Sequence, residues 1–246
     1  MSVTALAPVD KLPVPVLDHP HWRVNFRPAS YDSKRVATLS DCLSVLEKTK
    51  VNLRGWTFPQ LPPEKSGRDY GDSWIAAWSD FMGHLEYWRF YQSTQFLYLG
   101  SVREVTEEEW AVRIRDKMKQ GMSQVDIDNV PGFLALTESL YNITEYFEFA
   151  ARLAQAEIYV EPVTVSISVT GIAGFMLADD QRRVRSPYIA RQAEVRYEKT
   201  LTPLELIATA AERAIDCAIW LFERFGWLNP SVDAIRTEQQ QLLRRS

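Results

Sequence analysis

Hydrophobic and polar side chains alternate strictly from residue 163 to residue 170. The apolar positions are Val163, Val165, Ile167 and Val169, and the polar positions are Thr164, Ser166, Ser168 and Thr170. A period of two places the apolar side chains on one face of a strand and the polar side chains on the other. The pattern therefore predicts a strand of an antiparallel sheet with one buried and one solvated face. The segment 186–200, which follows an arginine-rich loop, is its expected partner.

Helical periodicity flanks this pair of strands. Spacings of three and four residues join Leu136, Leu140, Ile143, Phe147, Ala150 and Leu153. They predict an amphipathic helix along residues 136–157. Thr202, Pro203 and Glu205 combine an N-cap, a proline at the first helical position and a capping-box glutamate, so a second helix should begin there. We expect that helix to run to Phe225, with Gly226 at its C-terminus.

The first half of the chain contains weaker patterns. Residues 22–26 alternate in a first strand that Pro28 ends, and Thr38 or Ser40 can cap the helix that follows. A long loop rich in Gly and Pro covers residues 53–72.

The next segment predicts a helix and then a hairpin. Trp74, Trp78, Phe81 and Leu85 have the spacing of one helical face. We therefore expect a helix over about 72–85. The β-rich runs on either side of Ser93-Thr94 predict a hairpin over 86–104, and continuation of the helix to Tyr91 is the alternative.

The two halves of the chain share the order helix, hairpin, helix, over about 72–120 and about 134–226. The first unit should close with a helix that begins at a capping box of Thr106 and Glu109. This order favours an α+β fold, in which antiparallel strands pack against amphipathic helices. The expected parts are a flexible Pro-rich arm (1–20), a single α+β domain (21–226) and a polar C-terminal tail or weak helix (227–246).

Composition favours a soluble cytoplasmic protein. Of its 246 residues, 46% are hydrophobic and 24% are charged. No run reaches the roughly 18 uncharged apolar residues of a membrane helix, and the first residues lack the pattern of a secretory signal. Cys42 and Cys217 lie in helical patterns far apart, so we expect buried thiols in a reducing compartment.

Positive charge is concentrated in one segment of an acidic chain. The net charge is −4, whereas residues 181–199 hold six cationic side chains against two glutamates, hence +4. The candidate anion-binding residues are Arg182, Arg183, Arg185, Arg191 and Arg196. Arginine forks suit phosphates, and the tyrosines between them could stack on bases. A solvated loop that pairs with acids elsewhere, or that docks an acidic protein, is the alternative.

Aromatic residues are concentrated between Tyr70 and Tyr98. In the predicted hairpin, Tyr87 and Tyr91 lie on one face and Trp88 and Phe90 on the other. Since both faces carry aromatic side chains, another element or a partner should cover at least one of them. We take these four residues as a candidate interface of a homo-oligomer or of a complex with another protein.

Signals for catalysis or metal binding are sparse. His84 lies close in sequence to Asp80 and Glu86, the minimum for general-base chemistry in a hydrolase-like enzyme. A capping or partly buried histidine is the alternative. The His19–His21 segment has no obvious third ligand, so we assign no metal, and the glycines at 171–174 do not form a nucleotide fingerprint, so we assign no cofactor.

Four stretches, HWRVNFRP, LRGWTFP, SDFMGHLEYWRFYQSTQF and NITEYFEFAARLA, resemble those of a family of uncharacterised prokaryotic proteins. The resemblance covers most of residues 21–226. It implies a role near nucleic-acid metabolism or phage defence and carries over no catalytic residue.

The sequence as a whole favours a non-catalytic binding or interaction module that forms a homo-oligomer. Its basic hairpin at 181–199 would contact nucleic acid or another anion. An enzyme that uses His84 is one alternative, and a structural subunit or adaptor is a further one.

Overall fold

The protein has a mixed α+β fold, as predicted. The computed structural model describes residues 14–62, 67–81, 83–122, 125–179 and 186–244. The strands are β1 (His21–Pro28), β2 (Arg68–Tyr70), β3 (Trp74–Phe81), β4 (His84–Tyr91), β5 (Phe96–Ser101), β6 (Phe133–Ala135), β7 (Val163–Thr170), β8 (Met176–Ala178) and β9 (Glu194–Leu201). The helices are α1 (Val14–Leu17), α2 (Leu39–Thr49), α3 (Arg103–Thr106), α4 (Glu108–Gly121), η1 (Ile127–Asn129), α5 (Leu136–Gln155), α6 (Pro203–Arg224) and α7 (Val232–Leu243).

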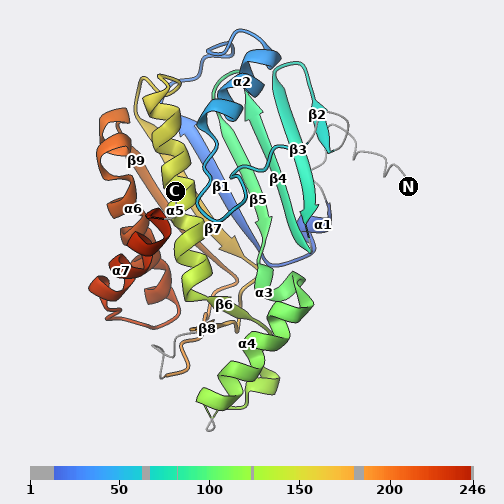
Figure 1. Ribbon diagram of the computed structural model, residues 1–246, viewed down its shortest axis with the longest axis vertical. Coiled ribbons are helices and arrows are strands. Elements are labelled where there is room, and N and C mark those ends of the chain that lie inside the picture. The colour runs from blue at the N-terminus through green and yellow to red at the C-terminus, as the bar shows by residue number, and fades with distance from the viewer. Residues whose placement is uncertain (1–13, 63–66, 82, 123–124, 180–185, 245–246) are drawn as a thin grey trace.

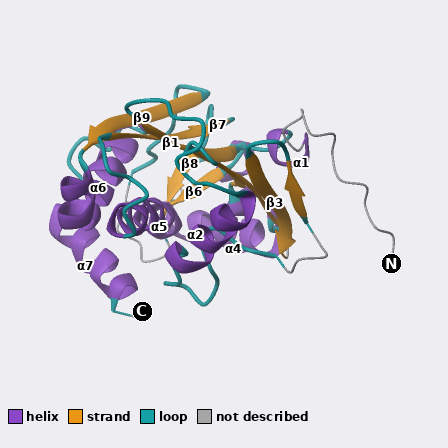
Figure 2. Cartoon of the chain, turned by 90° about the horizontal axis from the view of Figure 1, so that it is seen from above, coloured by secondary structure: helices purple, strands orange, loops and turns teal. Residues whose placement is uncertain are grey.

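Seven strands form one antiparallel sheet in the order β2-β3-β4-β5-β1-β7-β9. β1 lies between β5 and β7 and so joins strands from both halves of the chain (Figure 1). β6 and β8 form a separate, parallel pair. Figure 2 shows the sheet as one layer and α2, α5 and α6 as a second layer against one of its faces. The core therefore lies between the sheet and these helices.

The strand and helix predictions with the clearest local signals are confirmed. β7 covers the alternating segment, and β9 pairs with it along its whole length. α5 is buried along the predicted stripe, and α6 begins with the capping box of Thr202 and Glu205. Gly226, at a φ of +94°, follows the end of α6 in the left-handed conformation that glycine favours.

The segment predicted as an aromatic helix is instead a strand. β3 pairs with β4 along its whole length, from Trp74 opposite Tyr91 to Phe81 opposite His84. The helix over 72–85 and its continuation to Tyr91 are therefore both wrong, whereas the hairpin of β4 and β5 is confirmed. The first helix–hairpin–helix unit becomes a meander of four strands, β2 to β5, followed by short α3 and α4.

The error has a physical cause. Trp74 and Trp78 are four residues apart, a spacing that keeps them on one face of a strand as well as of a helix. Ile75 and Ala77 then make the other face apolar too, which removes the period of two that marks a half-buried strand. Both faces are covered in the structure, because Trp74 joins a small second cluster with Val16 of α1 on the side away from the helices.

Two helix ends also differ from the predictions. The capping box of Thr106 and Glu109 does not form; α4 begins after Glu107, which provides no side-chain cap. Residues 227–246 contain α7, which packs on α5 and α6 through buried Ile235 and Leu242. Of the two conformations predicted for this segment, a polar tail or a weak helix, the structure has the helix.

The two cysteines are both buried free thiols. Burial raises the pKa of Cys42 to about 11 and also raises the pKa of Cys217. Across the described part of the chain, none of the helices has the length and apolar character needed to span a membrane.

Candidate functional site

The sheet face that points away from the helices is polar over β1, β7 and β9. Its side chains form three rows across these strands, given by the register of the pairing. The rows are Arg23, Ser168 and Arg196; Asn25, Ser166 and Glu198; and Arg27, Thr164 and Thr200. We call these nine residues the open face. The opposite side chains of the same strands, such as Val24 and Ile167, are buried in the core.

A groove runs along the open face. It has a volume of about 340 Å³ and extends from the three strands to the β4–β5 hairpin, where Tyr91 and Gln95 line it. A second hollow of about 350 Å³ shares Arg27, Gln95 and Thr164 with it and reaches Tyr31. Tyr31 is 77% exposed. The two hollows therefore lie next to each other, and the second has an accessible aromatic ring in its lining.

The groove is positively charged within an acidic protein. Arg23, Arg27 and Arg196 stand against one lining glutamate, Glu198, a balance of +3 and −1. Arg196 pairs with Glu194 of its own strand at 3.0 Å, and both side chains are well exposed. Among the described residues, Arg23 and Arg27 have no acidic partner. Two exposed guanidinium groups are thus available to an external anion.

The arginines predicted from the sequence are only partly described. Arg182, Arg183 and Arg185 lie outside the described residues. Arg191 is exposed in the loop before β9, and Arg196 lies on the open face. The structure adds Arg23 and Arg27, which the sequence analysis missed. The signal was available in β1, where Arg23, Asn25 and Arg27 alternate with the apolar side chains of the same strand.

Of the four aromatic residues predicted as an interface, two face the core. Trp88 and Phe90 are 1% and 0% exposed and pack under the helices, so they do not form a surface. Tyr87 and Tyr91 lie on the opposite face beside Arg89, whose Nε donates to the Tyr87 hydroxyl at 2.8 Å. Tyr87 is 7% exposed, and of the four only Tyr91 lines the groove.

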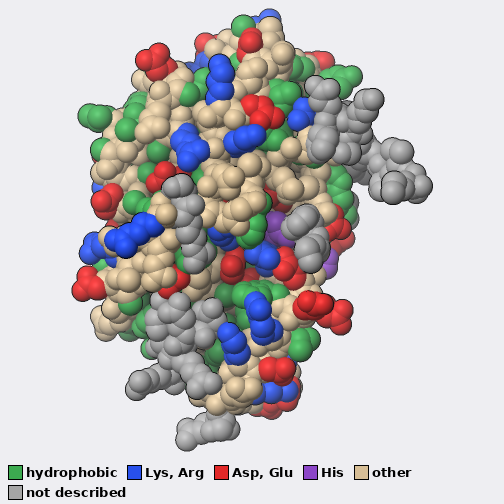
Figure 3. Space-filling model, in the orientation of Figure 1, with side chains coloured by type: hydrophobic (Ala, Val, Ile, Leu, Met, Phe, Trp, Pro, Cys, Tyr) green, Lys and Arg blue, Asp and Glu red, His purple; other side chains and the backbone are tan. Residues whose placement is uncertain are grey.

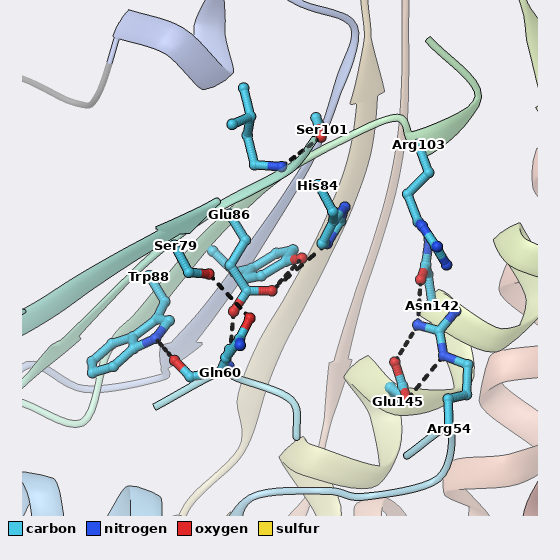
Figure 4. A network of polar contacts seen from close by, with 12 residues as sticks. Arg54, Gln60, Ser79, His84, Glu86, Trp88, Ser101, Arg103, Asn142 and Glu145 are labelled. Carbon is cyan, nitrogen blue, oxygen red and sulfur yellow. Dashed lines mark hydrogen bonds and ion pairs between the residues drawn. The ribbon is translucent and has the colours of Figure 1, made fainter. Parts of the chain in front are cut away.

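The same strands carry a buried polar network on their core side (Figure 4). Glu86 of β4 accepts hydrogen bonds from the backbone N–H of Gln60 at 2.8 Å and from the Tyr98 hydroxyl at 3.3 Å. The backbone carbonyl oxygen of Gln60 accepts a hydrogen bond from Trp88 Nε1 at 2.6 Å. Ser79 donates to the Gln60 side chain at 3.1 Å. These bonds fix the loop after α2 against the sheet.

His84 lies at the edge of this network. Its Nε2 is 3.7 Å from Glu86 Oε2, longer than a hydrogen bond, and its buried Nδ1 has no hydrogen-bond partner among the residues that the structure describes. Asp80 does not join the pair; it accepts a hydrogen bond from the Gly83 amide in the β3–β4 turn. The structure thus brings His84 and Glu86 together but leaves Asp80 apart. Glu86 already accepts hydrogen bonds from Gln60 and Tyr98, so its carboxylate holds the loop after α2 against the sheet. Catalysis by His84 stays a prediction.

A second part of the buried polar region surrounds Arg54. Its guanidinium contacts Glu138 at 2.8 Å, Asn142 at 2.6 Å and Glu145 at 2.5 Å, all on α5. Burial lowers the pKa of Arg54, but the two carboxylates outweigh burial and raise it above its ordinary value. No group of three or more His, Cys, Asp or Glu side chains is arranged to hold a metal ion anywhere in the described ranges. Arg54 balances one of the two carboxylate charges, and Arg103, whose Nη1 lies 3.4 Å from Glu138 Oε2, brings a second positive charge.

The helix-covered side of the molecule has a different charge pattern. There, Lys and Arg side chains lie among Asp and Glu side chains over the surface (Figure 3). The arginines of the open face belong to the other side of the sheet, away from this mixed surface. The open face is therefore the stronger candidate for an anion-binding site.

No protein-family model, curated protein or solved structure matches the chain. The resemblance of its four stretches to a prokaryotic family stays a prediction. Function is therefore inferred from the residues themselves.

Proposed function

We propose that the protein is a non-catalytic module that binds single-stranded nucleic acid on the open face of its sheet. The observation that carries this proposal is the pair Arg23 and Arg27. Both side chains are exposed and have no acidic partner among the described residues, and both line a groove rich in hydroxyl and amide groups. Arginine binds phosphate through two parallel hydrogen bonds, which makes it suited to such a ligand.

The spacing of the arginines favours a polyanion over a single phosphate. Arg23 and Arg27 are four residues apart on β1, which corresponds to about 13 Å along a strand. Arg196 lies two strands away from Arg23, or about 10 Å across the sheet. One phosphate group could not contact all three guanidinium groups, whereas a chain of phosphates could.

The other groove residues favour a single strand over a duplex. Asn25, Gln95 and Ser166 offer hydrogen-bond donors and acceptors, which could bind the exposed base edges of an unpaired strand. Tyr91 lines the groove and Tyr31 lines the adjacent hollow, and stacking on such aromatic rings is tolerant of base identity. We therefore expect little sequence preference.

This proposal extends the predicted anion site at 181–199, because Arg196 contributes to the groove. It keeps the cytoplasmic location expected from the sequence. The arginines at 182, 183 and 185 add to the proposed basic surface only as predictions from the sequence.

Fluorescence anisotropy with short labelled DNA and RNA tests the proposal. The single strands and the matching duplexes are titrated with wild-type protein at low salt. The variant is Arg23→Ala/Arg27→Ala. Its matched control is Arg236→Ala/Arg244→Ala, which removes the same charge from exposed positions on and next to α7.

We expect the wild type and the control to bind single strands more tightly than duplexes, and the Arg23/Arg27 variant to bind at least tenfold more weakly. Absence of binding by the wild type would reject the proposal. Equal loss in both variants would show that net charge, rather than the open face, attracts the ligand.

A further inference from the structure

β9 is an edge strand whose outer side is unpaired within the described part of the chain. It ends the seven-stranded sheet and pairs with β7 alone. Its eight residues contain no proline, and no backbone hydrogen bond between described residues reaches its outer side. An edge of this kind presents unpaired N–H and C=O groups that can accept a further strand.

We propose that β9 pairs with β9 of a second copy of this chain, so that the two sheets become one. The pairing is antiparallel and two-fold symmetric, with Tyr197 opposite the partner's Tyr197. This inference rests on the edge and its charges and does not depend on the proposed nucleic-acid function.

The charges of β9 select this register. Glu194, Arg196 and Glu198 lie on the open face of the sheet, and a continuous sheet must keep them on that face in both copies. With Tyr197 on the symmetry axis, Arg196 lies opposite the partner's Glu198, and Glu198 lies opposite the partner's Arg196. Opposite charges at directly facing positions stabilise a strand pair.

The neighbouring registers are unfavourable. A shift of the axis to Arg196 places Arg196 opposite itself and Glu194 opposite Glu198. A shift to Glu198 places Glu198 opposite itself. Like charges at facing positions are destabilising, so the strand is self-complementary in one of these three registers only.

The core side of the edge also fits a second copy. Tyr197 packs against Trp220 of α6 with their ring centroids 5.8 Å apart, and both side chains are only half-buried. Across the proposed axis, the two tyrosines would lie side by side and cover each other. Aromatic pairs at facing positions add to the stability of a sheet.

The pairing has a consequence for the open face. Both grooves would lie on the same side of one continuous sheet, with the row of Arg23, Ser168 and Arg196 in each copy. A long ligand could then contact both copies, and the two sites would act with a shared effective concentration.

Charge reversal tests the register. The variants are Arg196→Glu, Glu198→Arg and the double variant Arg196→Glu/Glu198→Arg. Both substituted positions are exposed, so folding should be preserved, and circular dichroism checks it. Arg27→Glu is the control, because it reverses a charge on the same face but away from the edge. Mass is measured by light scattering after size exclusion and by sedimentation velocity.

We expect the wild type, the double variant and the Arg27→Glu control to have twice the 28.3 kDa mass of one chain. Each single variant should have the mass of one chain, since like charges then face each other. A monomeric wild type at all concentrations would overturn the proposal. If dimers persist in both single variants, or if the double variant is monomeric, the two copies do not pair through β9 in this register. Loss of nucleic-acid binding by a dimeric Arg27→Glu protein would leave this inference intact.

Discussion

Arg54 and Glu145 form an ion pair inside the protein. Nη2 of the arginine lies 2.5 Å from Oε2 of the glutamate, and the two side chains are 8% and 1% exposed. The pair joins the loop after α2 to the middle of α5, and it is completed by bonds from Arg54 to Glu138 and Asn142. It is one of several buried polar groups in a core that is mainly aromatic and aliphatic.

Removal of Arg54 should destabilise the fold strongly. In Arg54→Met, the Glu145 carboxylate stays buried without its counter-charge, so we expect a loss of about 3–5 kcal/mol in the free energy of unfolding. Urea denaturation measures this loss. Arg236→Ala is the control, since the exposed pair with Asp233 at 3.5 Å should contribute less than about 1 kcal/mol. Equal losses in both variants would contradict a structural role for Arg54. If Arg54→Met fails to fold, Glu145→Gln gives a milder test of the same pair.

Salt should reveal which arginines contact phosphates. If Arg23 binds a phosphate of a single strand, Arg23→Ala should reduce the slope of log affinity against log salt by roughly 0.7. The slope for Arg236→Ala should equal that of the wild type. A slope that is the same in all three proteins would mean that Arg23 does not contact the backbone.

The charge of Glu104 should make stability depend on pH. Burial raises its pKa from 4.5 to about 7, an effect that its hydrogen bond from the Ala135 amide only partly offsets. Between these two values, the folded state binds more protons than the unfolded state, so stability should fall as pH rises through this window and level off above it. Glu104→Gln keeps an acceptor for the amide and removes the titration.

We therefore expect Glu104→Gln to be more stable than the wild type well above pH 7, by at most about 3 kcal/mol. The advantage should vanish near pH 4.5, where the wild-type carboxyl is neutral in the folded state. Thermal melts of both proteins across this range measure the difference. A constant difference would show that Glu104 does not titrate in this way.

Gly83 should be required for the β3–β4 turn. It has a φ of +86°, and a Cβ atom there would lie 2.8 Å from the Thr106 carbonyl oxygen. Gly83→Ala should therefore cost about 1–3 kcal/mol through backbone strain, with the clash in addition. Gly121→Ala is the matched control, because at that position in α4 no neighbouring atom of the described residues lies within 4 Å of the added Cβ, so alanine should be tolerated. If the two variants melt at the same temperature, the turn does not depend on the glycine.

Local signals in the sequence determined much of the fold. The alternation in β7, the stripe of α5 and the capping box of Thr202 and Glu205 each specify their element within a few residues. Such signals depend on backbone geometry and on hydrogen bonds between near neighbours, so they are visible without the rest of the chain. The order of predicted helices and hairpins likewise indicated an α+β fold, and the charge distribution indicated a concentration of basic side chains at 181–199.

Tertiary structure decided the conformation of β3 and the composition of the candidate site. The spacing of Trp74 and Trp78 suits a helix and a strand equally, and only pairing with β4 on one side and β2 on the other selects the strand. Arg23 and Arg196 lie far apart in the sequence and come onto one face of the sheet because β7 pairs with both β1 and β9. Arg54 finds Glu145 for a similar reason, when the loop after α2 packs on α5. These relationships arise from long-range pairing and burial, which no local pattern in the chain encodes.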